Sequence, residues 1–447
     1  MRNFAKLAAA LLLLSGCAHY APQPLASEPA ALAAPVAQAL ETKANAVERP
    51  WLKPAAVDLA KPLTPDAIAA LAVVNNPDLA ALRAKAGVAD AQVFAAGLLP
   101  DPSISLGADK VLSGPDTFLQ IAGSLGLDLN ALRTHAVTRQ KAVAERKQVR
   151  LDLAWAEWQA AGDAQIEAVR VISLSRQVAQ LQAANDAAQS ILERSARAAE
   201  RGDLSASAAT AARVAAFDAA DRLRAAQQGL ITARQALNRL LGLPPDIKLA
   251  LSEAPLPPPP PAANVLFSAV RERRPDLAAL RAGYAAQEAA VHKAILDQFP
   301  NLNLSVNSSR DTSGNTLLGP SIDFTLPLWN RNRGGIAIER ATRSALKAEY
   351  DARLFQARSE IATAIQGIAL ARNQRDQALD GLPHLRRQAE ASRASAIRGD
   401  LSDAAAVAAE QQLRDRLVPL ATSEQAIREQ TIALELLSGE TSEAWTK

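Results

Sequence analysis

The chain has 447 residues, of which 49% are hydrophobic but only 4% are aromatic. The low aromatic content argues against several ordinary globular cores, and the alanine-rich composition favours long, closely packed helices. The net charge is only +3, with basic and acidic residues interspersed, which gives no indication of nucleic-acid binding.

The N-terminus has the features of an exported lipoprotein. Residues 1–16 combine a positive start, at Arg2 and Lys6, with a short apolar run that is typical of a secretory signal peptide. The single cysteine, Cys17, follows directly and resembles the lipidated residue of a bacterial lipoprotein, with palmitate among its acyl chains. Ala18 rather than an aspartate comes next, which by the same resemblance favours sorting to the outer membrane.

The rest of the chain divides into an extended segment and two repeats. Residues 17–64 are rich in proline and alanine, which predicts an extended N-terminal segment that Trp51 attaches to the body. We then predict a first structural repeat over 65–250, a proline-rich linker over 251–263, a second repeat over 264–440 and a tail over 441–447. The linker prolines favour an extended polyproline form.

Three motifs occur in both repeats at an offset of 197 or 198 residues, which indicates an internal duplication. The pairs are NPDLAALRA at 76–84 with RPDLAALRA at 274–282, PSISL at 102–106 with PNLNL at 300–304, and RGDLS at 201–205 with RGDLS at 398–402.

Each repeat has the same predicted plan: a helix, a strand pair, a very long helix and a closing helix. In the first repeat the helix is predicted over 65–99, the strand pair over 102–109 and 118–129, the long helix over 131–200 and the closing helix over 203–241. In the second repeat the corresponding ranges are 264–298, 300–309 and 318–328, 331–398, and 401–438. At about 1.5 Å per residue the long helices measure about 100 Å. Pro383 and Pro419 are expected to kink or locally break their helices.

Apolar and polar residues alternate along the predicted strands over about ten residues, the length of a membrane strand. In 118–129 the leucines share one face and Asp128 lies on the other; in 318–328 Asp323 lies opposite Ile322 and Phe324. After the signal peptide no stretch has the roughly 18 apolar residues that a membrane helix needs, so strands would make any membrane crossing. An amphipathic strand on a soluble core has the same alternation, but the chain has no further strands to form that core.

The number of strands predicts an oligomer. Four strands cannot close around a lumen, and open edges in lipid would leave backbone groups without partners. Two chains would supply eight strands, which form a barrel filled by its own side chains. Three chains would supply twelve, enough to enclose water, so we predict a homotrimer whose helices continue the wall as a tube.

These features together resemble the TolC-type outer-membrane efflux family over about residues 65–440. The resemblance rests on the duplicated halves, the NPDLAALRA-type openings, the paired RGDLS turns and the segment LPLWNRNRG at 326–334. That segment is most similar to the lipoprotein branch serving cobalt-zinc-cadmium heavy-metal efflux. The resemblance implies a mainly α fold with a membrane β-barrel: duplicated helix–hairpin–long helix–helix halves, and a trimeric 12-stranded β-barrel continued by a periplasmic α-helical barrel.

By this resemblance the protein is the passive exit duct of a tripartite efflux system in a Gram-negative bacterium, without enzymatic activity or a cofactor. It lies among the lipids of the outer membrane and extends into the periplasm. Its partners are a periplasmic adaptor (membrane fusion) protein and an inner-membrane transporter, for which the resemblance favours the RND type and heavy-metal cations as cargo. Multidrug and type I secretion ducts have the same fold and stay open as alternatives.

The two RGDLS turns are the candidate adaptor-docking tips, because the length of the helices places them about 100 Å from the strands. Gly202 and Gly399 can end a helix with a positive φ, while Asp203 and Asp400 can cap the next one, with a serine close by. The candidate docking residues are Arg201, Gly202, Asp203, Leu204, Ser205, Arg398, Gly399, Asp400, Leu401 and Ser402. A purely structural turn is an equally good interpretation.

Charged residues near the second tip are candidates for a periplasmic gate. Arg398, Asp400 and Asp403 would tie neighbouring chains together, and rings of carboxylates favour cations in a pore. A solvated helix end is the alternative. Asp128 and Asp323 are expected to face the barrel lumen and keep it wet.

No metal site or enzyme motif is predicted. The histidines His19, His135, His292 and His384 are widely spaced, and the chain has no pair with the spacing of a zinc site. Two interpretations compete with a channel: a periplasmic helical scaffold lipoprotein that forms no pore, and a lipid-anchored enzyme, which no group of residues supports.

Overall fold

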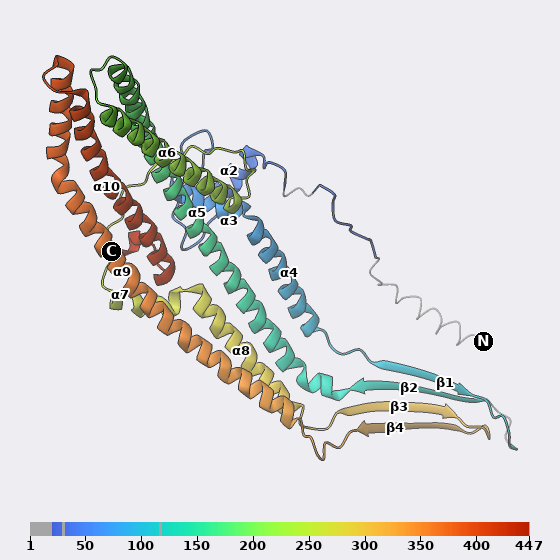
Figure 1. Cartoon of the computed structure of the whole chain (residues 1–447). Helices are drawn as coiled ribbons and strands as arrows, with labels where there is room; N and C mark the ends of the chain where they lie inside the picture. The colour runs from blue at the N-terminus through green and yellow to red at the C-terminus, as the bar shows by residue number, and fades with distance from the viewer. Residues whose placement is uncertain (1–19, 29–31, 116–118, 447) are drawn as a thin grey trace.

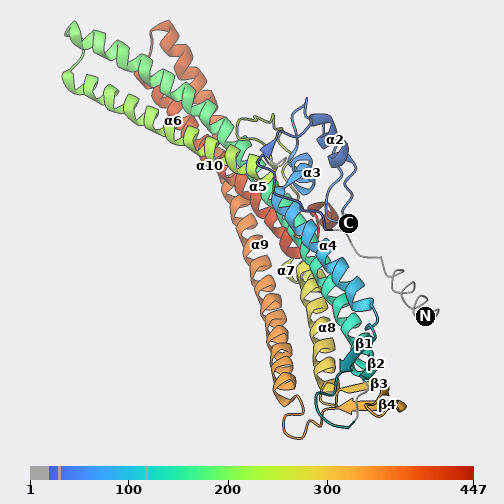
Figure 2. The ribbon, with the colours of Figure 1, turned by 90° about the vertical axis from the view of Figure 1, so that its right-hand side faces the viewer.

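The structure, a computed structural model, describes residues 20–28, 32–115 and 119–446. It is elongated, with a four-stranded sheet at one end and two helical hairpins at the other (Figures 1 and 2). Contrary to the prediction, the N-terminal segment is not extended throughout, because it includes α2 (Ala37–Asn45); from α2 onward it folds against the middle of the molecule. A short 3₁₀ helix, η3 (Ser442–Thr446), closes the described chain.

The two repeats contain the same elements in the same order. The first comprises α3 (Pro65–Asn75), α4 (Pro77–Gly97), β1 (Ser103–Asp109), β2 (Gln120–Asp128), α5 (Leu129–Glu200) and α6 (Ala206–Leu240). The second comprises α7 (Ala263–Arg273), α8 (Pro275–Leu296), β3 (Leu302–Arg310), β4 (Thr316–Phe324), α9 (Arg333–Arg398) and α10 (Asp403–Ser438).

The first helix predicted for each repeat is in fact two helices, so those two predictions were wrong. The breaks fall at Asn76 and Arg274, where the backbone is extended with ψ of 125° and 121°. Each residue precedes a proline, whose ring excludes the helical conformation from its neighbour. Pro77 and Pro275 then begin the next helix, where the missing N–H needs no partner.

The four strands form one antiparallel sheet in the order β1-β2-β3-β4. The second strand predicted for the second repeat was too long, because β4 ends at Phe324 rather than at residue 328. Pro327 cannot donate to a strand ladder, and the Leu328 N–H bonds to the Leu326 carbonyl 2.9 Å away, which turns the chain.

The helices that carry the strands pack in the same order as the strands themselves. Contacts run from α4 to α5, from α5 to α8 and from α8 to α9, so α4 and α9 lie on the two outer edges of this layer. At the base of the sheet β2 continues directly into α5, and short connecting segments join the other three strands to their helices. The sheet and the helical layer are therefore two parts of one wall.

The long helices continue past this layer and form two hairpins, α5 with α6 and α9 with α10. The predicted local breaks did not occur: α9 continues through Pro383 and α10 through Pro419. Buried Ala378, Leu382 and Ala389 lie on either side of Pro383. Tertiary packing around the proline therefore outweighs the loss of one hydrogen bond.

Both repeats build the same joint in the middle of the molecule. The Asn76 amide donates to the Leu240 carbonyl at 2.9 Å, and the Arg274 guanidinium donates to the Leu437 carbonyl at 3.2 Å. These two pairs are related by the offset of the duplication. In each case the residue before the proline ties the broken helix to the end of the hairpin, at α6 or α10. Arg274 is 1% exposed and also lies over the ring of Trp155, 5.1 Å from its centre.

The N-terminal segment is attached to this joint by an aromatic stack and an ion network. Trp51, the anchor expected from the sequence, stacks on Trp158 with ring centres 5.5 Å apart. Glu157, which is 3% exposed, accepts hydrogen bonds from Arg49 at 2.7 Å and from Arg83 at 2.6 Å. Burial alone would raise the pKa of Glu157, but the two arginines hold it below its ordinary value.

We expect Glu157→Ala to release the N-terminal segment. The change removes the shared partner of Arg49 and Arg83, and loss of one member of a buried ion group costs about 2–3 kcal/mol when its partners are partly exposed. Trypsin cleavage after Lys43, in the N-terminal segment, should therefore become about tenfold faster or more. Glu145→Ala, which removes an exposed pair with Lys141, is the matched control.

The same network predicts a pH dependence. Because the pKa of folded Glu157 is lowered, its contribution is complete above the ordinary value of 4.5 and is lost as pH falls through the folded value. Protection of the N-terminal segment, followed by an acid-stable protease such as pepsin, should decline as the pH falls below about 4.5. Protection that declines equally in Glu157→Ala would show that another group is responsible.

Candidate functional site

The four-stranded sheet has one apolar face. The register places Ile104 opposite Leu125, Leu125 opposite Val306, and Val306 opposite Pro320, so these side chains form a row across all four strands. They are not packed against the protein: Ile104 is 72% exposed and Leu125 is 53% exposed. An apolar sheet face of this kind needs an apolar environment that the single chain does not provide.

The opposite face is polar and holds both predicted lumen residues. Asp128 and Asp323 each pair with Asn303, from its two sides, so the three lie in one row across β2, β3 and β4. Hydroxyl pairs follow further along this face, with Ser105 and Ser124 2.6 Å apart. Asp128 has a second role that the sequence analysis missed: its carboxylate caps α5 by accepting from two backbone N–H groups, at 2.8 and 3.0 Å.

Both edges of the sheet are open in the single chain. Within the described residues, β1 and β4 each pair with one strand only. An exposed edge with free backbone N–H and carbonyl groups is a template for pairing with another chain. The sheet thus combines one lipid-compatible face, one polar face and two unpaired edges.

The predicted tip residues lie at the two hairpin turns, at the end of the molecule opposite the sheet (Figure 1). Gly202 and Gly399 have φ of +79° and +81°, which is the left-handed conformation that glycine adopts most easily. The following N–H groups bond back to Ala198 at 2.8 Å and to Ser395 at 2.9 Å, so both turns have the same closure.

The capping residues of these turns differ from the prediction. Ser205 and Ser402, rather than the aspartates, cap α6 and α10, each by accepting from a backbone N–H at 3.3 Å. Asp203 instead pairs with Arg201 at 3.0 Å. The aspartates are two positions too early in the chain to cap these helices, because each serine is the residue directly before its helix. Leu204 and Leu401 lie between the aspartate and the serine of their turns.

The gate candidates are only partly described. Arg398 pairs with Asp400 of its own turn at 2.9 Å, and both side chains are more than 60% exposed. Asp403 begins α10, and its side chain lies outside the described part of the structure. Ties between neighbouring chains at this tip stay a prediction.

Two residues singled out in the sequence lie outside the described part of the structure. Cys17, the predicted lipidation site, and His19 fall in the undescribed N-terminal stretch. Across 20–28, 32–115 and 119–446, no three His, Cys, Asp or Glu side chains are grouped as metal ligands would be. In the same ranges, no helix combines the length and the apolar character that crossing a bilayer requires.

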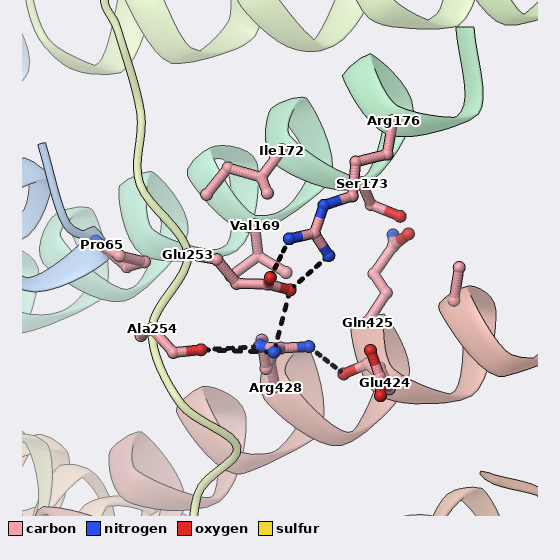
Figure 3. Close-up of a pocket in the computed structure, with 11 residues that line it drawn as sticks. Pro65, Val169, Ile172, Ser173, Arg176, Glu253, Ala254, Glu424, Gln425 and Arg428 are labelled. Atoms are coloured by element: carbon pink, nitrogen blue, oxygen red, sulfur yellow. Dashed lines mark hydrogen bonds and ion pairs between the residues drawn. The ribbon is translucent and has the colours of Figure 1, made fainter. Parts of the chain in front are cut away.

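A small pocket lies where the linker crosses the molecule. Its lining residues bind the linker to the helices, so it is a structural contact and not a substrate site. Glu253 of the linker lies between Arg176 of α5, at 2.8 Å, and Arg428 of α10, at 2.9 Å (Figure 3). Arg428 also donates to the carbonyl of Ala254 at 3.2 Å. The cavity is about 20 Å³, room for a single water molecule. The linker therefore holds the two repeats together.

The comparisons with known proteins agree with this geometry. Residues 266–440, nearly the whole second repeat, match the family model described as outer membrane efflux protein. Over 306 residues the chain is 26% identical to the cobalt-zinc-cadmium resistance protein CzcC of Cupriavidus metallidurans. The matched region covers 65% of this chain and 69% of that protein.

Solved structures share the fold over most of the chain. CusC has a TM-score of 0.65 at 18% identity, over 84% of this chain and 92% of that one. The outer membrane channel CmeC of Campylobacter jejuni has a TM-score of 0.69 at 16% identity, over 84% and 85%. The mainly helical TolC-type fold expected from the sequence is confirmed. The CmeC structure is described as an outer membrane channel, and at these identities the likeness to it and to CusC shows a shared fold. The second repeat thus matches the outer membrane efflux protein family model, and most of the chain shares the fold of these channels.

Proposed function

We propose that three copies of this chain form a closed β-barrel in the outer membrane, continued by a tube of helices through the periplasm. One observation carries the proposal: a single sheet exposes an apolar face, holds a polar face and leaves the edges of β1 and β4 unpaired. Three sheets joined edge to edge put the apolar face toward lipid and the polar face around water. Each strand then continues into a helix of the tube wall. Lipidation of Cys17 would anchor the same assembly.

The hairpin tips are the proposed docking surface for the adaptor. Outer membrane efflux proteins work with a periplasmic adaptor and an inner-membrane pump, for which we propose the RND type. Both turns have an exposed arginine–aspartate pair. The space beside Gly202 and Gly399 is open, because a Cβ added at either glycine would have no atom within 4 Å. Two chemically equal turns per chain would give a trimer six sites for a repeated partner.

We propose heavy-metal cations as the cargo, supported by the similarity to CzcC, whose name states cobalt, zinc and cadmium resistance. The test is deletion of the gene in its own host, followed by growth with cobalt, zinc or cadmium salts. Increased sensitivity to the metals, reversed by the intact gene, supports the proposal. Increased sensitivity to antibiotics alone would assign a multidrug duct instead, and loss of a secreted protein would assign a secretion duct.

We expect Asp403→Ala to raise the ion conductance of the reconstituted channel. The residue begins α10 at the proposed entrance, where removing one carboxylate from each chain would weaken ties between neighbouring chains. Planar-bilayer recording measures the conductance directly. Asp221→Ala removes an exposed carboxylate on α6, away from the turn, and is the control. Equal conductance of both variants and the parent would remove Asp403 from the gate.

A further inference from the structure

Two groups of exposed apolar side chains lie at the base of the sheet, on opposite edges of the molecule. One group precedes β1 and the other follows β4, the two outer strands (Figure 1). The members are Phe94, Leu98 and Leu99 in the first group, and Leu326, Leu328 and Trp329 in the second. Trp329 is 86% exposed and Phe94 is 71% exposed, so neither group is covered within its own chain.

The second group is held in place rather than left loose. Arg331 and Asn332 have φ of +43° and +49°, a conformation that residues other than glycine rarely adopt. The Asn332 amide donates to the Ala294 carbonyl of α8 at 2.8 Å, and the Arg333 N–H bonds to the Asn330 carbonyl at 2.9 Å. A segment fixed in this way presents Trp329 in a defined position.

We propose that these two groups form a contact between neighbouring copies of the chain, a collar at the base of the barrel. The inference rests on the proposed trimer and adds a second interface to it. When β4 of one copy pairs antiparallel with β1 of the next, the end of β4 and the start of β1 meet at the base of the sheet. The segment after Phe324 then lies beside the segment before Ser103 of the neighbour. The edge at β1 thus carries one group of the collar, and the edge at β4 carries the other.

The distribution of the apolar residues favours a second copy over membrane lipid as the occupant. A lipid belt would need apolar side chains all around the base, including below the middle strands β2 and β3. There, however, the Arg133 guanidinium lies over the ring of Phe299, 5.5 Å from its centre, and also donates to the Leu296 carbonyl at 3.0 Å. Lys293 and Asp297 form an ion pair close by, at 2.7 Å. Phe299 is itself 53% exposed, so the middle of the base has an exposed ring, whereas each outer edge has a group of three uncovered apolar side chains. The uncovered apolar residues are thus more concentrated at the edges that meet in a trimer.

The test is cysteine cross-linking of the full-length lipoprotein in outer membranes. The pairs Leu98→Cys with Leu328→Cys, and Leu99→Cys with Trp329→Cys, should give disulfide-linked dimers and trimers on mild oxidation. The corresponding single variants should not, which also controls for Cys17. Leu112→Cys with Trp329→Cys is the matched control, because Leu112 is 93% exposed but lies in the loop at the far end of the sheet.

Two outcomes would overturn the inference, and native gels run on the same membranes distinguish them. Trimers that give no cross-link with either pair would refute the collar and leave the proposed channel intact. Monomers would refute the channel and the collar together. A photoreactive benzoylphenylalanine in place of Trp329 identifies the occupant directly: an adduct with a second chain supports the collar, and an adduct with phospholipid refutes it.

Discussion

Replacing Gly439 with alanine is expected to destabilise the protein far more than the same change at Gly399. Both glycines follow a long helix with a positive φ, of +78° and +81°, so each alanine pays the same conformational cost of about 1 kcal/mol. Only Gly439 is crowded: a Cβ there would lie 2.8 Å from the Arg273 Cβ and 3.1 Å from its carbonyl carbon. We therefore expect a loss of about 3 kcal/mol or more at Gly439.

Thermal unfolding of the purified variants, followed by circular dichroism, measures this difference. Gly399 has no atom within 4 Å of the added carbon, which makes Gly399→Ala a control for the backbone alone. Gly242 is related to Gly439 by the duplication and is pressed against the backbone of Asn75, so Gly242→Ala should behave like Gly439→Ala. Equal unfolding midpoints for Gly439→Ala and Gly399→Ala would contradict the close packing of Gly439 against Arg273.

Leu125→Arg should prevent stable insertion in the outer membrane, whereas Ser124→Arg should be tolerated. The two residues are neighbours on β2 and point to opposite faces of the sheet. If the apolar face meets lipid, an arginine near the middle of the bilayer costs about 2–4 kcal/mol per chain, while the same residue facing water costs little. The trimer would multiply this difference by three.

Outer-membrane fractionation and the temperature at which trimers dissociate in detergent provide the measurement. Ser124 does bond to Ser105 at 2.6 Å, so a small loss is expected from Ser124→Arg as well. If the apolar face meets lipid, the loss of trimer stability from Leu125→Arg must be clearly larger. The reverse order would mean that the apolar face packs on protein, as the scaffold interpretation requires.

The features that the sequence predicted well are those that depend on local patterns. The offset of 197 or 198 residues revealed the duplication, and the alternation along 118–129 placed Asp128 on the face opposite the leucines, as the register confirms. Gly202 and Gly399 marked the ends of the longest helices because few other residues adopt their backbone conformation.

The effect of proline on the helices was predicted wrongly in two ways: two breaks were missed and two expected breaks did not occur. The breaks before Pro77 and Pro275 follow from a steric rule that the sequence makes visible, yet helical periodicity on both sides concealed them. Pro383 and Pro419 do not break their helices, because packing along helices of 66 and 36 residues outweighs a local loss. The sequence alone does not show which prolines are supported by neighbours.

Contacts between distant residues escaped the sequence analysis altogether. Arg49 and Glu157 are 108 positions apart, and Lys53 reaches Glu435 across 382 positions. Charged residues are common in this chain, so nothing in the sequence identifies one such pair among many. The proposed collar was missed for a related reason: its two groups are over 220 positions apart, and their places at the two outer strands are known only from the sheet order.

The number of chains in the assembled protein decides whether the sheets of three copies close into one barrel. Native mass spectrometry of the full-length lipoprotein, released from nanodiscs of outer-membrane lipid, reports that number without cross-linking or mutation. We predict the mass of three lipidated chains, because four strands with two open edges require two further copies to close around water. A single chain with its apolar sheet face stably accommodated in the bilayer would contradict it.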